Sequence, residues 1–132
     1  MLHHFQNVEV VRIVSEQLKN KGYVQTYDWT KNNKASTIED LKEIGQEEKK
    51  AVMEADFLIM LLPAGKGSHI EFGIALGQGK KIYLYSQNNE VSNFETTSTF
   101  YHLSEVEIVI GTIDELLTKV TNSKEKQKAM ES

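Results

Sequence analysis

The sequence contains no cysteine, one proline and one tryptophan among its 132 residues. Without cysteine, neither disulfides nor thiolate metal sites can form, which is typical of proteins from a reducing compartment. The longest apolar runs are about seven residues, far below the roughly 20 that a membrane-spanning helix needs. Neither a signal peptide nor a lipidation motif is visible at the N-terminus. These absences predict a cytoplasmic protein with no membrane partner.

The composition is that of an ordinary globular domain. Hydrophobic residues make up 39% and charged residues 26% of the chain, and the formal net charge is −4. A negative balance argues against a nucleic acid as partner. From residue 122 onward the sequence is mostly Lys, Glu, Gln and Ser, which bury too little surface to stay ordered. We therefore predict a single domain over residues 1–121 and a disordered polar tail over residues 122–132.

Hydrophobic periodicity alternates between helical and extended segments. The predicted helices span residues 7–21, 36–55, 68–79 and 112–121, and the predicted strands span residues 23–29, 57–62, 82–85 and 107–110. This alternation predicts an α/β fold, Rossmann-like or flavodoxin-like in three layers. Its mainly parallel sheet should have about four to five strands, with helices on both faces.

The start of the chain is unusual for such a fold. A doubly wound sheet normally begins with a strand, whereas Met1–His3 provides at most a stub before a helix capped by Asn7. Either the sheet is smaller than usual, or a partner covers its exposed edge.

Glu71 is the acid best placed for chemistry. It follows an apolar strand and a glycine-rich turn, at the sheet edge where parallel α/β folds bind ligands. Near a helix N-terminus the ionised carboxylate is favoured, as a nucleophile requires. The alternative is structural, because Ser68–Glu71 matches a capping box. Ser36–Glu39 and Thr112–Glu115 match the same pattern.

The turn Gly65-Lys66-Gly67-Ser68 is similar to a phosphate or oxyanion cradle, since free amides and a hydroxyl precede a helix. It is not a P-loop, because the Gly-Lys-Ser/Thr ending is missing, and it lacks the third glycine of a dinucleotide fingerprint. A tight turn that simply needs glycine is the alternative.

Two further acids are candidates. Asp56 opens the apolar strand, where it could also bind a loop amide or cap a helix end. Glu48 falls on the inward stripe of the helix over residues 36–55, and Gly45 leaves room beside it. A slightly rotated helix, with Ile44 on the stripe, would instead place Glu48 at its margin.

The remaining candidates are less defined. No metal site is predicted, because ligand spacing is missing among His3, His4, His69 and His102. Trp29 should either stack on a flat ligand or pack in the core. The polar segment over residues 86–99 is a candidate lid or subunit contact.

The strongest motif lies in residues 55–86, ADFLIMLLPAGKGSHIEFGIALGQGKKIYLYS, which resemble the nucleoside 2-deoxyribosyltransferase family. That family carries an Ala-Asp strand, a glycine turn, a Glu-x-Gly-x-Ala helix and a Gly-Lys pair. The matching residues here are Ala55-Asp56, Gly65–Ser68, Glu71–Ala75 and Gly79-Lys80. Glu48 holds the place of an acid that the family often has in the preceding helix. The resemblance covers residues 8–117.

The resemblance implies a cofactor-independent enzyme that cleaves the N-glycosidic bond of a 2′-deoxynucleoside or its monophosphate. Glu71 would attack the anomeric carbon, and a base or water would then take the sugar from the covalent intermediate. Glu48 and Asp56 would hold the sugar hydroxyl or assist protonation of the leaving base. Substrate contacts would come from Gly65, Gly67, Ser68, His69 and Trp29. Such enzymes are homodimers or higher homo-oligomers whose neighbours complete each site.

This sequence departs from the family's pattern in two places. The family opens with a strand and a small-residue loop, whereas this sequence starts after that strand; Glu48 stands where the family commonly has Asp. One alternative is therefore a non-catalytic nucleotide-binding module of the same fold, with Glu71 as a helix cap. Another is a nucleoside-monophosphate phosphoribohydrolase, whose Pro-Gly-Gly-x-Gly-Thr-x-x-Glu motif is similar to Pro63–Glu71 except at Ala64.

Overall fold

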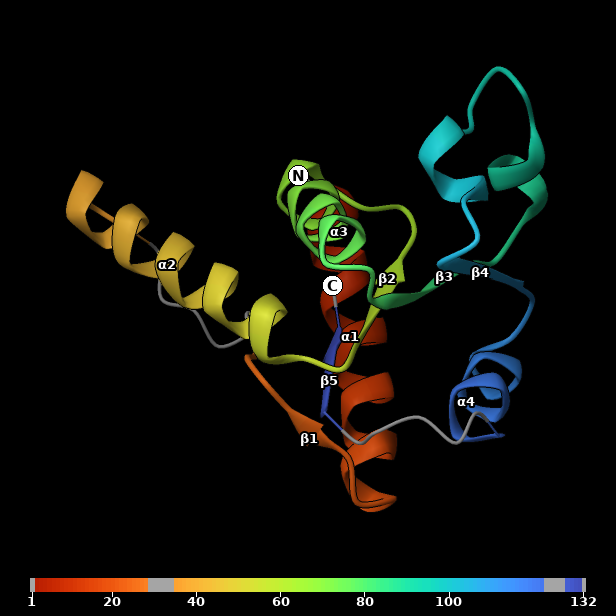
Figure 1. Cartoon of the computed structure of the whole chain (residues 1–132), viewed down its shortest axis with the longest axis horizontal. Coiled ribbons are helices and arrows are strands. Elements are labelled where there is room, and N and C mark those ends of the chain that lie inside the picture. Colours follow the sequence, from red (N-terminus) through yellow and green to blue (C-terminus); the bar gives the residue numbers. More distant parts are fainter. Residues whose placement is uncertain (1, 29–34, 123–127, 132) are drawn as a thin grey trace.

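The computed structural model of the chain describes residues 2–28, 35–122 and 128–131, with side chains from Val8 onward (Figure 1). Its α-helices are α1 (Leu2–Asn20), α2 (Ile38–Glu54), α3 (Lys66–Gly77) and α4 (Ile113–Asn122). Its strands are β1 (Val24–Gln25), β2 (Phe57–Leu61), β3 (Lys81–Ser86), β4 (Val106–Ile110) and β5 (Lys128–Glu131). The short 3₁₀ helices η2 (Asn89–Ser92) and η3 (Thr99–His102) lie between β3 and β4.

The strands form one parallel sheet in the order β1-β5-β2-β3-β4. α1 and α4 pack on one face, and α2 and α3 pack on the other, which gives three layers (Figure 1). Both faces need this cover because a parallel sheet is buried on both sides. The predicted Rossmann-like or flavodoxin-like α/β fold is therefore confirmed.

β2 lies in the middle of the core. All of its residues are buried, and alternate side chains point to opposite faces of the sheet. Phe57 faces α1 and α4, where it packs edge-on against Tyr23 and Tyr83 with ring-centroid distances of 5.9 and 5.6 Å. Leu58 and Met60 face α2 and α3. The apolar run predicted this buried strand correctly.

β5 completes the sheet in its interior. It lies between β1 and β2, and Ala129 is paired with Gln25 on one side and with Phe57 on the other. The three residues Ala129–Glu131 are each at most 1% exposed. The sheet therefore contains an interior strand between β1 and β2 that hydrophobic periodicity did not predict.

The predicted disordered tail is wrong for residues 128–131, which form β5, and for Asn122, which ends α4. Residues 123–127 and 132 lie outside the described residues. The prediction from composition failed because β5 lies between two strands, β1 and β2, which supply backbone hydrogen-bond partners on both sides. A short polar sequence can be ordered in such a position.

Asp56 anchors the start of β5. Its backbone amide donates to the carbonyl oxygen of Lys128 at 2.8 Å, and its Oδ2 accepts from the backbone nitrogen of Lys128 at 3.1 Å. On the β1 side, the amide of Thr26 donates to the carbonyl oxygen of Ala129 at 3.1 Å. These bonds set the register of β5 against both neighbours.

A buried carboxyl group ends β5. Glu131 Oε1 accepts from Ser15 Oγ at 2.6 Å and from Gln25 Nε2 at 2.9 Å. Burial raises the pKa of Glu131 from 4.5 to about 7, while these two hydrogen bonds and the charge of Lys19 act in the opposite sense and the charge of Asp28 adds to the rise. One polar group thus joins α1, β1 and β5.

Helix and strand boundaries differ from the predicted ones near the N-terminus. α1 begins at Leu2, where we expected at most a stub. α2 is capped by Thr37, whose Oγ1 accepts from the Asp40 amide at 3.0 Å, so its capping pair lies one residue later than predicted. Of the predicted strand over residues 23–29, the structure describes residues 23–28, and among these only Val24 and Gln25 are in a strand, β1.

The capping box at the start of α4 is confirmed. The amide of Glu115 donates to Thr112 Oγ1 at 3.2 Å, and the amide of Thr112 donates to Glu115 Oε1 at 3.3 Å. Gly111, which directly follows β4, has φ +143, in the region that favours glycine.

Only the C-terminal part of α2 packs on the sheet. Ala51 and Val52 are buried, whereas Ile38 and Leu41, near the N-terminus of the helix, are 76% and 56% exposed. In Figure 1 the N-terminal half of α2 projects beyond the sheet. Periodicity found the apolar face of this helix, but it could not show how far the sheet extends beneath it.

Lys80 closes the C-terminus of α2. Its Nζ donates to the carbonyl oxygens of Val52 at 2.9 Å and Met53 at 2.6 Å, and also to that of Ala55. A cation at this end of a helix satisfies terminal carbonyls and complements the helix dipole. Burial lowers the pKa of Lys80, and the charge of Asp56 opposes that change. Lys80 therefore ties α2 to the start of β3.

We expect Glu131→Gln to change how stability depends on pH. The folded-state pKa of Glu131 is raised to about 7, so the folded protein holds this proton more tightly than the unfolded chain does. The resulting stabilisation is complete below the unfolded value of 4.5 and is lost as the pH rises through about 7.

A shift of this size corresponds to a free energy on the order of 3 kcal/mol. Urea unfolding between about pH 4 and pH 8 should therefore show a steeper loss of stability in the wild type than in Glu131→Gln. Parallel pH profiles of the two proteins would contradict the burial of an ionisable Glu131.

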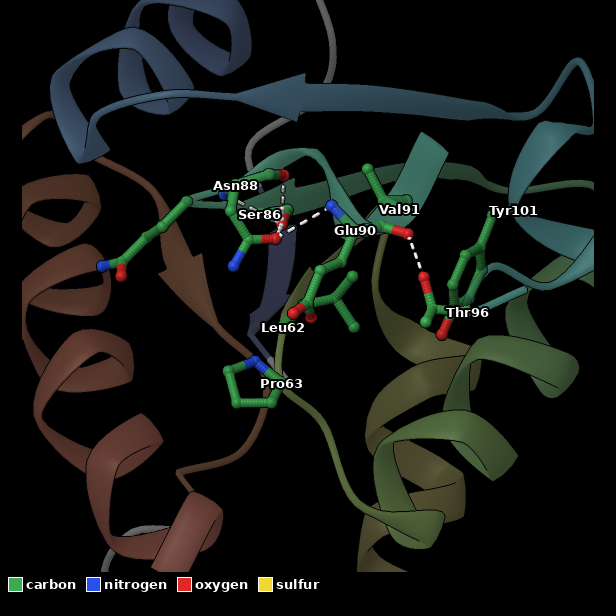
Figure 2. Close-up of a pocket in the computed structure, with 9 residues that line it drawn as sticks. Leu62, Pro63, Ser86, Asn88, Glu90, Val91, Thr96 and Tyr101 are labelled. Carbon is green, nitrogen blue, oxygen red and sulfur yellow. Dashed lines mark hydrogen bonds between the residues drawn. The ribbon is translucent and has the colours of Figure 1, made fainter. Parts of the chain in front are cut away.

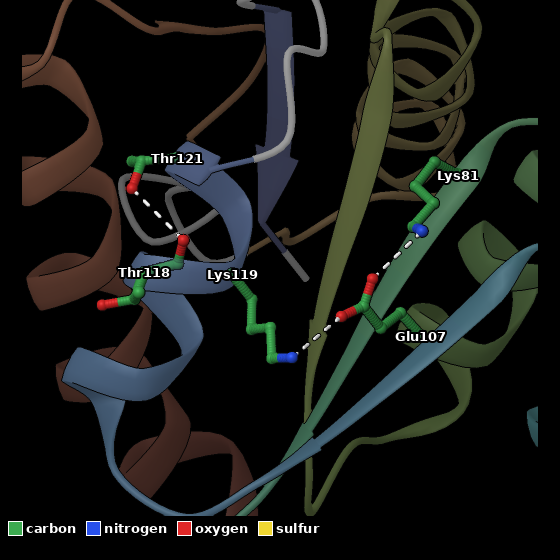
Figure 3. A network of polar contacts seen from close by, with 5 residues as sticks. All are labelled: Lys81, Glu107, Thr118, Lys119 and Thr121. Carbon is green, nitrogen blue, oxygen red and sulfur yellow. Dashed lines mark hydrogen bonds and ion pairs between the residues drawn. The ribbon is translucent and has the colours of Figure 1, made fainter.

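Replacing Lys80 tests the closure of α2. Lys80→Met keeps the aliphatic stem but removes the donors, and we expect it to lower the free energy of unfolding by roughly 1–3 kcal/mol. The matched control is Lys81→Met. Lys81 Nζ lies 3.1 Å from Glu107 Oε1, and Lys119 Nζ lies 3.9 Å from Glu107 Oε2, in a partly exposed group (Figure 3).

Such an exposed group contributes only about 0–1 kcal/mol, so the control should lose less stability in denaturant unfolding than Lys80→Met. Equal losses in the two variants would show that Lys80 does not hold the end of α2.

Candidate functional site

The carboxyl ends of β2 and β3 lead into the segments of the candidate site. β2 continues into Pro63, the glycine turn and α3, and β3 continues into the segment that carries η2 and η3. The amide of Leu62 donates to the carbonyl oxygen of Tyr85 at 2.9 Å, which holds the two strand ends together. Parallel α/β sheets bind ligands at this edge.

A cavity of about 270 Å³ opens between these two strand ends (Figure 2). Its lining comes from the end of β2, the end of β3 and the segment after β3: Leu62, Pro63, Ser86, Gln87, Asn88, Glu90, Val91, Thr96 and Tyr101. The volume is just below the roughly 300–1,000 Å³ of typical ligand pockets. The cavity therefore suits a small molecule.

None of these lining residues is among the site residues that the sequence predicted. The sequence indicated only a lid or a subunit contact for residues 86–99, because the packing of this segment against the end of β2 depends on the fold. The usable signal was the polar run Ser86–Glu90, which directly follows a predicted buried strand and so had to emerge at the carboxyl edge of the sheet.

The glycine turn forms the N-terminus of α3. Gly65 is the N-cap residue, and it provides no side-chain capping bond. Neither Gly65 nor Gly67 has a positive φ, and a Cβ added to either would meet nothing within 4 Å. Packing within the described part of the chain therefore does not require glycine at these positions. The open space leaves room for a ligand beside the helix N-terminus.

Glu71 lies within α3 and not at its start. Because α3 begins at Lys66, Glu71 is in the second turn, and the predicted capping box of Ser68 with Glu71 is wrong. The residue is only 6% exposed, while Ser68 in the first turn is half-buried. The burial of this carboxyl group therefore has to be explained by something other than helix capping.

His69 links the glycine turn to the segment after β3. Its Nδ1 lies 2.8 Å from the carbonyl oxygen of Gly65, and its Nε2 lies 2.7 Å from Tyr101 Oη. A carbonyl oxygen only accepts, so Nδ1 carries a proton, and in the neutral ring the Tyr101 hydroxyl donates to Nε2. The two rings stack with centroids 6.0 Å apart. His69 thus positions a residue that lines the cavity.

The structure does not bring Asp56 to this edge. Asp56 directly precedes β2 at the amino edge of the sheet, roughly 16 Å from the other end of this five-residue strand. Its carboxylate accepts from Lys128 in β5, as the structural alternative for Asp56 proposed. Glu71 and the glycine turn stand at the opposite edge.

Glu48 and Trp29 are less clearly placed. Glu48 is half-buried on α2, which packs against α3, and Ile44 one turn earlier is half-buried as well. Both the catalytic and the marginal interpretation of Glu48 fit that position. Trp29 lies outside the described residues.

Within residues 2–28, 35–122 and 128–131, no group of three or more His, Asp or Glu residues could hold a metal ion. In the same ranges, no helix is both long and apolar enough to cross a membrane. The chain matches no protein-family model, no curated protein and no solved structure. The function therefore has to be argued from the geometry of the carboxyl edge.

Gly67→Ala separates the packing of the turn from its capacity to bind a ligand. Since a methyl group meets no neighbour there, the free energy of unfolding should stay unchanged or rise by about 0.4–1 kcal/mol. If the turn receives a ligand, the same methyl should weaken binding of 2′-deoxynucleoside monophosphates, measured by calorimetry.

The matched control is Gly79→Ala, at a residue with φ +69 just after α3. It should cost about 1–2 kcal/mol of stability and leave binding unchanged. Undiminished binding in Gly67→Ala would exclude the turn as a ligand cradle.

Proposed function

We propose that this protein cleaves or transfers at the N-glycosidic bond of a 2′-deoxynucleoside or its monophosphate. The observation that carries the proposal is the burial of Glu71, which is 6% exposed in α3 just behind the open glycine turn. A carboxylate withdrawn from water, at the edge where parallel sheets bind ligands, suits a nucleophile that forms a covalent intermediate.

In the proposed reaction a carboxylate oxygen of Glu71 forms a bond to the anomeric carbon as the glycosidic carbon–nitrogen bond breaks. The base leaves with the bonding electron pair and takes a proton from water. A second base, or water, then displaces Glu71 from the deoxyribosyl ester and releases it again as a carboxylate. The entering group gives up a proton, which neutralises the hydroxide left by the first step. Two successive displacements of this kind follow the logic of retaining glycosidases.

The glycine turn would receive the 5′ end of the substrate. Gly65, Gly67 and Ser68 lie at the N-terminus of α3, where backbone amides favour an anion, and the exposed Lys66 adds a positive charge. His69 is held beside the turn by its contact with Gly65. Asp56 has no role in this reaction, because it is engaged with β5 at the other edge. No cofactor takes part.

The same proposal includes a homodimer or larger homo-oligomer in the cytoplasm. Ile38 and Leu41, which are 76% and 56% exposed on the projecting half of α2, support this assembly. A second copy of the chain would remove this apolar surface from water.

A non-catalytic nucleotide-binding module is the second candidate. The position of Asp56 favours it, because one of the three acids expected to do chemistry serves the sheet instead. In such a module the glycine turn would bind the nucleotide, and Glu71 would have only a packing or polar role inside α3.

Glu71→Gln should abolish turnover in a protein that remains folded, because an amide cannot form the sugar ester. We expect base release from a panel of 2′-deoxynucleosides and monophosphates, with a free acceptor base present, to fall by roughly a thousandfold or more when followed by chromatography. Glu47→Gln, at an exposed position on α2, is the matched control and should keep the wild-type rate.

The result also separates the two candidates. A wild-type protein that releases no base, yet gains thermal stability from a nucleotide, would be a binding module. Full turnover in Glu71→Gln would refute the role of Glu71 as nucleophile.

A further inference from the structure

The cavity between β2 and β3 has a polar side and an apolar side. In Figure 2 the side chains of Asn88 and Glu90 extend from the segment after β3 toward Leu62 and Pro63, which directly follow β2. Tyr101 adds an aromatic side chain to the lining. Among the described residues that line the cavity there is no lysine or arginine.

The amide of Asn88 is held in one orientation. Its Oδ1 accepts from the backbone nitrogen of Glu90 at 3.0 Å and thereby caps η2. Ser86 Oγ lies 3.4 Å from the same oxygen. A flip of the amide would place its NH₂ group against the Glu90 N–H and break the cap, so the side chain presents Nδ2 as a hydrogen-bond donor.

Glu90 contributes an acceptor. Its backbone is fixed at both polar atoms, because its amide donates to Asn88 Oδ1 and its carbonyl oxygen accepts from Thr96 Oγ1 at 2.6 Å. The local structure of the segment therefore uses the backbone of Glu90. Its side chain is exposed, and an ionised carboxylate can only accept.

Tyr101 lines the cavity with an aromatic ring that is held in place by its neighbours. It is 7% exposed, its hydroxyl is bound to His69 Nε2 at 2.7 Å, and its ring packs edge-on against Phe72 at a centroid distance of 5.8 Å. Burial raises the pKa of Tyr101, which keeps the phenol uncharged. A flat ligand in the cavity would contact the aromatic side chain of Tyr101 and the apolar side chains of Leu62 and Pro63.

We propose that this cavity binds a small, uncharged, planar ring that carries an N–H group next to a carbonyl oxygen, that is, a lactam. The Asn88 amide donates to the carbonyl oxygen, and the Glu90 carboxylate accepts from the N–H group. The carboxylate and the lack of a lining cation disfavour anionic ligands. A volume of about 270 Å³ suits one or two rings and not a dinucleotide.

This inference rests on the proposed function in one respect: if the protein acts on nucleosides, the lactam is part of the nucleoside's base. Recognition of the ring itself does not involve Glu71, which is not among the residues that line the cavity. Binding of a free ring can therefore be measured without turnover.

The test compares two free bases that contain no glycosidic bond, hypoxanthine and 1-methylhypoxanthine. Methylation removes the N–H group beside the carbonyl and leaves the rings unchanged. By calorimetry we expect saturable binding of hypoxanthine and binding of the methylated base that is roughly ten- to a hundredfold weaker, the range for a hydrogen bond to a charged group. Equal affinities, or no binding of hypoxanthine at millimolar concentration, would overturn the proposal.

Two variants locate the interaction. Asn88→Asp keeps the acceptor that caps η2 but lacks the NH₂ donor, and Glu90→Ala removes the carboxylate while keeping both backbone bonds. Each should weaken hypoxanthine binding by roughly tenfold or more. Glu95→Ala, at an exposed residue on the same segment and outside the lining, should bind as the wild type does. Unchanged binding in both cavity variants would place the ligand elsewhere.

Glu71→Gln distinguishes this proposal from the reaction. It should still bind hypoxanthine, whatever its effect on base release. Loss of turnover with retained binding supports both proposals, and a wild type that binds hypoxanthine without any turnover would support the cavity while refuting the reaction. Turnover without hypoxanthine binding would refute the lactam site alone.

Discussion

The backbone pairing of β5 between β1 and β2 is the constraint on which the rest of the structure depends. Without it, two neighbouring strands would leave N–H and C=O groups unpaired in the interior, at a large cost in free energy. Asp56 fixes the start of β5 through two hydrogen bonds to Lys128, and Glu131 fixes its end through Ser15 and Gln25. These five residues thus connect β5 to α1, to β1 and to the start of β2.

The two edges of the sheet differ in how their residues are used. At the amino edge of the sheet, Asp56 and Lys80 are occupied with β5 and with the end of α2. At the carboxyl edge, the glycine turn is open and a cavity lies beside it. The contact of His69 with both Gly65 and Tyr101 joins these two features. A ligand with a sugar at the turn and a base in the cavity would use both.

Much of the fold followed from local patterns. The apolar run from Phe57 and the capping box at Thr112 each depend on residues that are close in sequence, and both were predicted correctly. The capping box at Ser68 failed because the same pattern also fits the interior of a helix. A motif defined by three-residue spacing does not indicate which turn of the helix it occupies. The start of α3 at Lys66 depends instead on where the chain leaves β2.

By itself, the sequence determined the α/β class, the buried central strand and the presence of Glu71 behind a glycine turn, since periodicity and turn chemistry are local properties. Tertiary structure alone decided that a polar segment at residues 128–131 is an interior strand, that Asp56 serves the sheet, and that Asn88 and Glu90 face the end of β2. Asp56 and Lys128 are 72 residues apart. Contacts between residues so far apart in sequence depend on which backbone N–H and C=O groups are still unpaired once the other strands have formed the sheet. Residue composition does not contain that information.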